Sequence, residues 1–176
     1  MRPSLVSARR LSAALAFAAA GAALQGCKLN GDTGLPPFTN PANVNFVTAT
    51  GVTLSSMTRV NEAVYTQDFV VGTGRTVAVG DSVVTYYTGM LPTGFVFDSR
   101  LTPATPSAFR LDTISVIRGW VEALPGMKVG GKRKLVIGPA KGYGYNTARD
   151  AAGNIIIPSN SVLVFDVEVL QAIPRP

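Results

Sequence analysis

Residues 116–120 (VIRGW) combine the only tryptophan of the chain with two adjacent β-branched residues. Four other short segments add aromatic side chains, further β-branched residues and one acid next to a phenylalanine: Tyr87-Thr88-Gly89, Phe97-Asp98-Ser99, Tyr143-Gly144 and Ile156-Ile157-Pro158. Such a set lines a dry, concave, aromatic pocket with few polar groups, the usual build of a small-ligand site. The chain has no histidine, which excludes histidine-based triads and most zinc sites. We therefore expect the pocket to act by binding, by shape or by changing a conformational barrier.

The elements that must position these residues are mostly strands. Stretches rich in β-branched and aromatic side chains, separated by glycine-marked turns, predict strands over residues 65–71, 82–91, 109–111, 132–137 and 161–170. Residues 116–124 have helical character and end at Pro125-Gly126. Residues 138–159 are expected to form one long loop, which in compact domains is usually functional or mobile. The sequence thus predicts an α+β domain over residues 65–172, with a curved antiparallel β-sheet wrapped around one short α-helix.

Three longer stretches, VVTYYTGMLPTGFVFDSR, VIRGWVEALPGMKVGGKRKLVI and IIIPSNSVLVFDVEVL, follow one another between about Val71 and Leu170. In order and spacing they resemble the FKBP-type peptidyl-prolyl cis-trans isomerases. The resemblance implies the FKBP fold and an isomerase that accelerates X–Pro bond rotation in exported proteins by desolvation and hydrogen bonding. It implies no cofactor, metal or nucleic acid. As partners it implies proline-containing peptides or unfolded exported proteins, and it allows macrolide inhibitors of the rapamycin type.

The resemblance also assigns roles to individual residues. Trp120 would form the floor of the pocket, and the Ile117 N–H and the Tyr143 hydroxyl would donate to a substrate carbonyl. Asp98 would organise the electrostatics of the site rather than transfer a proton. The remaining substrate-binding residues would be Tyr87, Phe97, Val116, Phe109, Ile157 and Phe165. Taken singly, each apolar member is also compatible with a plain core role, above all Ile157 and Phe165, and Asp98 with a turn cap.

One departure from the family pattern leaves two functions open. The pattern before the helix is Pro-Phe-x-Phe, whereas this chain reads Pro106-Ser107-Ala108-Phe109. Ser107 removes an aromatic contact from the pocket rim, worth about 1–2 kcal/mol of apolar burial. The first hypothesis is therefore a working isomerase, and the alternative is a catalytically weak client-binding or chaperone module.

Two other functions find little support in the sequence. An envelope hydrolase lacks both histidine and a paired-acid site. Residues 126–132, with the pattern Gly-x4-Gly-Lys, match most of a phosphate-binding loop. The match fails at the next position, because Arg133 stands where Ser or Thr must bind magnesium.

The N-terminus predicts export and lipidation. Residues 1–26 read as a lipoprotein signal peptide, with basic residues before an uncharged, Ala-rich stretch that is too short to span a membrane. The signal ends in LQGC, so Cys27, the only cysteine, is the expected lipidation site and membrane anchor. An ordinary secretory peptide with an incidental cysteine is the alternative. Lys28 favours the outer membrane, so we expect a bacterial cell-envelope protein that faces the periplasm.

The mature chain begins with segments of a different composition. Without the three arginines of the signal, 13 basic and 10 acidic residues remain, a balance too mild to indicate nucleic-acid binding.

Residues 27–43 are rich in Gly, Pro, Asn and Thr and predict a flexible tether. Residues 44–64 read as an N-terminal extension that could hold a short strand, and the sequence does not decide whether it packs on the domain. We expect a monomer, because the helical N-terminal arm of dimerising family members is missing.

Overall fold

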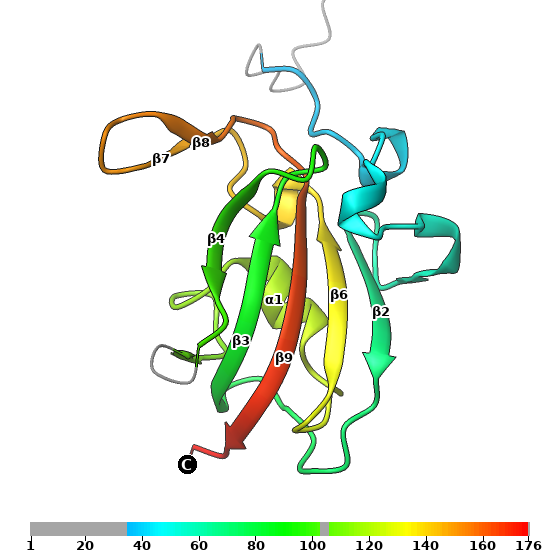
Figure 1. The fold of residues 1–176 in the computed structure, drawn as a ribbon, viewed down its shortest axis with the longest axis vertical. Helices are drawn as coiled ribbons and strands as arrows, with labels where there is room; N and C mark the ends of the chain where they lie inside the picture. Colours follow the sequence, from blue (N-terminus) through cyan, green and yellow to red (C-terminus); the bar gives the residue numbers. More distant parts are fainter. Residues whose placement is uncertain (1–34, 103–105, 176) are drawn as a thin grey trace, which may run out of the picture. The chain divides into compact units, whose positions relative to one another are not determined.

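The computed structural model describes residues 35–102 and 106–175 (Figure 1). The chain divides into two units, Met1–Leu35 and Pro36–Pro176, and nearly all described residues belong to the second. The predicted signal peptide and Cys27 lie outside the described residues, as does most of the predicted tether. Within the described part of the chain, no helix is long and apolar enough to cross a membrane.

A seven-stranded sheet forms the body of the second unit. Its order is β1-β2-β6-β9-β3-β4, with β5 paired to β3, and every pairing is antiparallel. The strands are β1 (Thr58–Arg59), β2 (Val64–Val70), β3 (Ser82–Met90), β4 (Val96–Arg100), β5 (Ser107–Arg110), β6 (Lys132–Ile137) and β9 (Leu163–Ile173). In Figure 1 the last strand, β9, runs between β6 and β3. The predicted curved antiparallel sheet is thereby confirmed.

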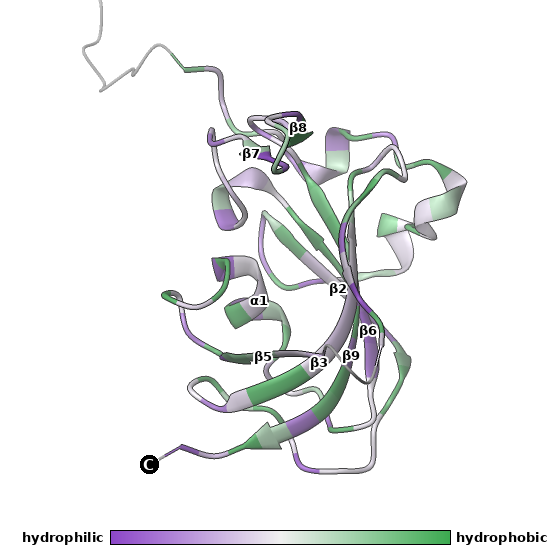
Figure 2. Cartoon of the chain, turned by 60° about the vertical axis from the view of Figure 1, so that its left-hand side comes forward, coloured by the Kyte–Doolittle hydropathy of each residue, from purple (hydrophilic) through white to green (hydrophobic). Residues whose placement is uncertain are grey.

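The single α-helix of the described residues, α1 (Arg118–Ala123), lies on the concave side of the sheet (Figure 2). It is shorter than the predicted 116–124, because Ile117 is extended, with φ −60° and ψ 147°. A Cβ on Gly119 would lie 2.5 Å from Cγ2 of Ile137, so only glycine lets the helix approach β6 this closely. Arg133 of β6 stabilises the other end of the helix, since its Nη1 donates to the Ala123 carbonyl at 2.6 Å.

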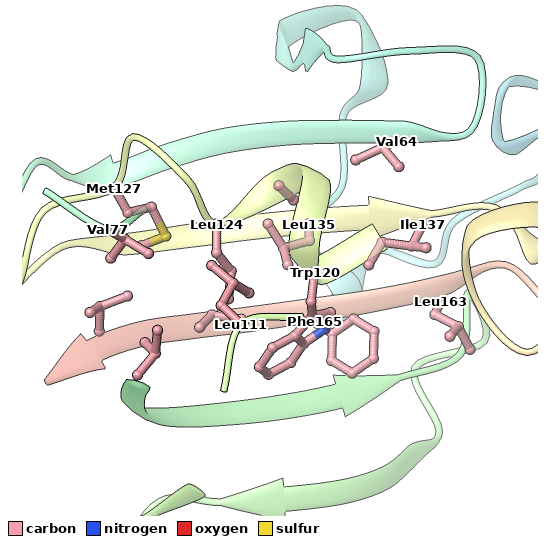
Figure 3. Close-up of a cluster of buried hydrophobic side chains, with 14 of the residues drawn as sticks. Val64, Val77, Leu111, Trp120, Leu124, Met127, Leu135, Ile137, Leu163 and Phe165 are labelled. Atoms are coloured by element: carbon pink, nitrogen blue, oxygen red, sulfur yellow. The ribbon is translucent and has the colours of Figure 1, made fainter. Parts of the chain in front are cut away.

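The inner core fills the space between α1 and the sheet. Figure 3 shows Trp120 and Leu124 from the helix segment meeting Leu135 of β6 and Phe165 of β9. Leu124 and Leu135 are wholly buried, and Trp120 is 5% exposed. Burial of such side chains is the main source of stability for a domain of this size.

An outer cluster covers part of the opposite face of the sheet. Its buried members are Met57, Tyr65, Met90, Val136, Val162 and Val164, and Val44, Phe46, Val52 and Leu54 pack against them. The N-terminal extension that contributes these last residues contains two 3-10 turns, η2 (Thr48–Thr50) and η3 (Leu54–Ser56), and a third, η1 (Pro41–Asn43), directly precedes it. The only strand within residues 44–60 is the two-residue β1. The extension thus packs on the domain, which the sequence left undecided.

The segment predicted as one long loop, residues 138–159, contains regular structure. It begins with a 3-10 turn, η4 (Pro139–Lys141), and continues into a hairpin of β7 (Ala148–Arg149) and β8 (Ile155–Ile157). Residues 36–43, which the sequence assigns to the tether, contact the domain instead. Pro41 is buried, and the Thr39 N–H donates to Asn160 Oδ1 at 2.9 Å.

Candidate functional site

A pocket of about 690 Å³ opens between α1 and the β3–β4–β9 side of the sheet. Nine of the ten residues predicted for the site line it: Tyr87, Phe97, Asp98, Phe109, Val116, Ile117, Trp120, Tyr143 and Phe165. The tenth, Ile157, is not among the lining residues and is 3% exposed within the inner core. Of the two interpretations open for Ile157, the structure therefore supports the core role.

The floor of the pocket is an aromatic cluster centred on Trp120. The rings of Tyr87, Phe109 and Phe165 each lie 5.3 Å from the indole, centroid to centroid, and meet it edge to face. Figure 3 shows the indole beside the Phe165 ring. Edge-to-face pairs place the positive rim of one ring against the negative face of another, which holds the rings in fixed orientations. The indole Nε1 is buried and has no hydrogen-bond partner among the described residues.

Gly89 of β3 makes room for two further walls of the pocket. In the sheet it pairs with Asp98 of β4 and with Phe165 of β9. A Cβ at this position would lie 2.6 Å from the Phe97 ring and 2.8 Å from the Phe165 ring. The two rings themselves meet edge to face at 5.6 Å. A glycine is therefore required for both aromatic walls to occupy their positions over the strand.

Asp98 organises the polar edge of the pocket. Its Oδ2 accepts a short hydrogen bond from the Tyr87 hydroxyl, and its Oδ1 accepts from the Ser99 N–H at 2.8 Å. Burial, the hydrogen bond to Asp98 and the charge of Asp98 together raise the pKa of Tyr87 to about 12. Arg100 Nε lies 4.0 Å from Oδ1 of Asp98, at the outer limit of an ion pair. The carboxylate thus fixes the Tyr87 ring against Trp120 while both of its oxygens remain occupied.

Tyr143 lies at the mouth of the pocket, on the segment that follows η4. Burial, and secondarily the negative charge of Asp98, raise the pKa of the Tyr143 hydroxyl above its ordinary value. This hydroxyl therefore stays protonated at neutral pH. The side chain is 41% exposed and donates no hydrogen bond within the described part of the chain. It is free to donate to a bound molecule.

The second unengaged donor is the backbone N–H of Ile117. It has no acceptor among the described residues, because Ile117 is extended and precedes the first helical turn. The preceding turn is held by Asp112, whose Oδ1 accepts from the N–H groups of Ile114 and Ser115. These bonds lower the pKa of Asp112, with the largest contribution from Ser115. The Val116 N–H also donates to the Asp112 carbonyl, at 3.2 Å.

Sequence reasoning missed several lining residues. They are Ala108, Thr113, Ile114, Ser115, Arg118 and Gly142, while Ser107, singled out as the departure from the family pattern, does line the pocket. Ile114 is 95% exposed, so a large apolar side chain projects into solvent at the pocket rim. The signal available in the sequence was an isoleucine between Thr113 and Ser115, directly before the VIRGW segment.

The comparisons with known proteins agree with this geometry. The family model described as FKBP-type peptidyl-prolyl cis-trans isomerase matches residues 73–170. The FK506-binding protein of Neisseria meningitidis is 42% identical over 105 residues, which make up 60% of this chain and 92% of that protein. The FKBP-type isomerase FkpA of Escherichia coli is 47% identical over 105 residues, but this chain spans only 36% of its length.

A solved structure shows the same arrangement. The crystal structure of AtFKBP13 superposes with a TM-score of 0.56 at 36% identity, covering 62% of this chain and 92% of that one. Three observations agree. The sheet wraps around one short helix, an aromatic pocket opens between helix and sheet, and the family model matches most of the domain. The chain belongs to the FKBP-type peptidyl-prolyl cis-trans isomerase family.

Proposed function

We propose that this chain catalyses cis-trans isomerisation of X–Pro peptide bonds in exported proteins. The observation that carries the proposal is the meeting of an apolar aromatic floor with two unengaged donors at one pocket. Trp120 supplies the floor, and the Tyr143 hydroxyl and the Ile117 N–H supply the donors. The volume of about 690 Å³ lies within the range of small-ligand sites and suits a prolyl ring with its flanking peptide units.

The chemistry requires no covalent step. An X–Pro bond meets a rotation barrier of about 18–20 kcal/mol because the amide has partial double-bond character, and it isomerises over tens of seconds or longer unassisted. The twisted transition state has lost amide resonance, so it is less dipolar than the planar amide. An apolar floor around Trp120 favours that species over the ground state. Lowering the barrier by about 5–8 kcal/mol corresponds to roughly four to six decades in rate.

The two donors hold the peptide while the bond turns. The Ile117 N–H and the Tyr143 hydroxyl each donate to a carbonyl of the substrate backbone, so that rotation is confined to the X–Pro bond. Asp98 does not transfer a proton in this scheme, because its oxygens accept from Tyr87 and Ser99. Its role is to fix the Tyr87 ring that packs edge to face on the Trp120 indole.

Ser107 supports the second candidate function, a client-binding module with weak catalysis. It lines the pocket beside Phe109, where an aromatic side chain would add apolar area. Loss of that area weakens binding of proline peptides and of rapamycin-type macrolides by about 1–2 kcal/mol. A loss of this size lowers activity without abolishing it, so isomerase activity remains the first proposal.

We also propose that the protein is lipid-anchored through Cys27 in the bacterial cell envelope, facing the periplasm from the outer membrane. The support comes from the sequence alone: a basic start, an apolar stretch, and the sequence LQGC, which ends in the only cysteine of the chain. We expect a monomer. Replacing Cys27 by serine should abolish acylation, read by mass spectrometry of the N-terminal peptide, and should release the protein from the membrane fraction. An unmodified Cys27 in the wild-type chain would show a plain secretory signal instead.

The isomerase proposal is tested with the full-length chain in mild detergent and short X–Pro peptides, with cis-to-trans exchange followed by NMR. Tyr143→Phe should lower kcat/KM about three- to tenfold, the loss expected for one hydrogen bond in the transition state. Tyr86→Phe is the matched control, because Tyr86 is a neighbour of Tyr87 on β3 but does not line the pocket. A folded wild-type chain that leaves the exchange rate unchanged would refute the enzyme and favour the binding module.

A further inference from the structure

The first described residues of the compact unit lie along the segment that carries Tyr143. We define residues 36–42 as the N-terminal strap. The Tyr145 hydroxyl donates to the Pro36 carbonyl, and the Phe38 ring stacks on the Tyr145 ring with centroids 4.5 Å apart and an interplanar angle of 20°. Only Gly144 separates Tyr145 from Tyr143 along the chain. The strap therefore contacts the backbone stretch that orients the Tyr143 side chain.

Asn160 joins the strap to the same segment from the other side. Its Oδ1 accepts from the Thr39 N–H at 2.9 Å, and its Nδ2 donates to the Pro37 carbonyl at 3.3 Å. Its own N–H donates to the Gly144 carbonyl at 2.9 Å. Asn160 is the only non-glycine residue in the described ranges with positive φ, at 59°, a conformation that asparagine tolerates better than most residues. A single strained residue thus connects the strap to the peptide unit next to Tyr143.

The Phe38 ring of the strap also faces Gly144. Gly144 has φ +60°, and a Cβ there would lie 3.8 Å from the Phe38 ring. The Gly144 N–H donates to the Pro139 carbonyl at 2.9 Å, and the Asn146 N–H donates to the Tyr143 carbonyl at 3.1 Å. The backbone on both sides of Tyr143 is therefore held, while the Tyr143 hydroxyl has no partner within the described part of the chain. Because no hydrogen bond fixes the hydroxyl, its position over the pocket is set by the backbone that carries Tyr143 and by the rotamer of the side chain.

We propose that the N-terminal strap is a positioning element for the active site, with Phe38 and Asn160 as positioning residues that hold the Tyr143 hydroxyl over the pocket. The inference rests on the proposed function, in which this hydroxyl donates to the substrate. A donor held in place before the substrate arrives loses less freedom on binding and on reaching the transition state. The strap supplies that order to a segment whose own 3-10 turn, η4, spans only three residues.

A double-mutant cycle in the full-length chain tests whether the strap acts through Tyr143. Phe38→Ala should lower kcat/KM for X–Pro peptides about three- to tenfold, the scale set by losing one aromatic pair. In the Tyr143→Phe background the same change should have no further effect. Phe38→Tyr should restore activity, because it keeps the stacked ring. Phe46→Ala is the matched control, since Phe46 belongs to the adjoining extension and packs on the outer cluster.

Amide hydrogen exchange gives a readout that does not depend on catalysis. Phe38→Ala and Asn160→Gly, which accommodates the positive φ, should both speed exchange at Gly144 and Asn146 and leave the amides of β6 unchanged. Unchanged protection in both variants, or an equal loss of activity in the Tyr143→Phe background, would overturn the proposal. An inactive wild-type chain would refute the proposed function instead. The exchange rates of the Gly144 and Asn146 amides would then decide by themselves whether the strap orders this segment.

Discussion

Replacing Tyr87 by phenylalanine should reduce the loss of stability that the wild-type domain suffers at alkaline pH. The Tyr87 hydroxyl is partly buried against Trp120 and donates to Asp98, and these surroundings raise its pKa from 10.0 to about 12. Between these two values the unfolded chain releases the phenolic proton while the folded chain keeps it. Stability from this group is therefore complete below about pH 10 and is lost as the pH rises toward 12.

The size of the effect follows from the shift. One pKa unit corresponds to 1.36 kcal/mol, so a shift of about two units corresponds to at most about 2.7 kcal/mol. The hydroxyl is only partly buried and Asp98 has 44% of its side chain exposed, so solvent screening reduces this to about 1–2 kcal/mol. At neutral pH the substitution removes one hydrogen bond to a charged, partly exposed acceptor. That loss costs about 1 kcal/mol.

The assay is urea unfolding of both proteins at several pH values, followed by far-UV circular dichroism, because Trp120 fluorescence would itself respond to the substitution. The free energy of unfolding of the wild-type chain should fall by about 1–2 kcal/mol more than that of Tyr87→Phe between pH 10 and 12. Asp98→Asn should give an intermediate slope, because it removes the charge and keeps the burial. Parallel curves for wild type and Tyr87→Phe across this range would refute the reasoning.

Three further substitutions test other parts of the site and its support. Gly89→Ala should destabilise the domain by about 1–3 kcal/mol and lower activity, because its Cβ would overlap the Phe97 and Phe165 rings; an unchanged thermal melt would contradict the packing. Ser107→Phe should tighten binding of a rapamycin-type macrolide by about 5- to 30-fold, measured by calorimetry, and no gain would show that the rim is not limiting. Arg133→Met should lower stability in urea by about 1–3 kcal/mol, since it removes the donor to the Ala123 carbonyl and the ion pair to Asp68; wild-type stability would mean that α1 needs no such support.

Most of the site could be predicted because the stretches around its residues resemble the FKBP-type isomerases in order and spacing. Trp120 and Phe165 are far apart in the chain, yet the resemblance assigns both to one pocket. Ile157 was uncertain for a physical reason, because the pocket floor and the inner core share aromatic members such as Trp120. Sequence alone does not place the boundary between them.

The strap could not be predicted, because its local composition points the other way. Residues 36–41 read PPFTNP, which is typical of a linker, and their order comes from partners more than 100 positions away, such as Asn160. Ile114 was missed for the opposite reason. A large apolar residue is expected inside, whereas its exposure at the rim is set by the turn that Asp112 stabilises.

The central place of β9 determines the order in which the domain can be completed. This strand includes Phe165 and pairs with both β6 and β3, yet among the described strands it is the last to be synthesised. Until it emerges, β3 lacks its longest partner and the pocket lacks one wall. Pairings of such large sequence separation form late and slowly, because the intervening chain must first be closed into a loop. A chain made from its N-terminus therefore leaves this sheet open until β9 has emerged, and the pocket proposed to hasten the folding of other proteins closes late in its own folding.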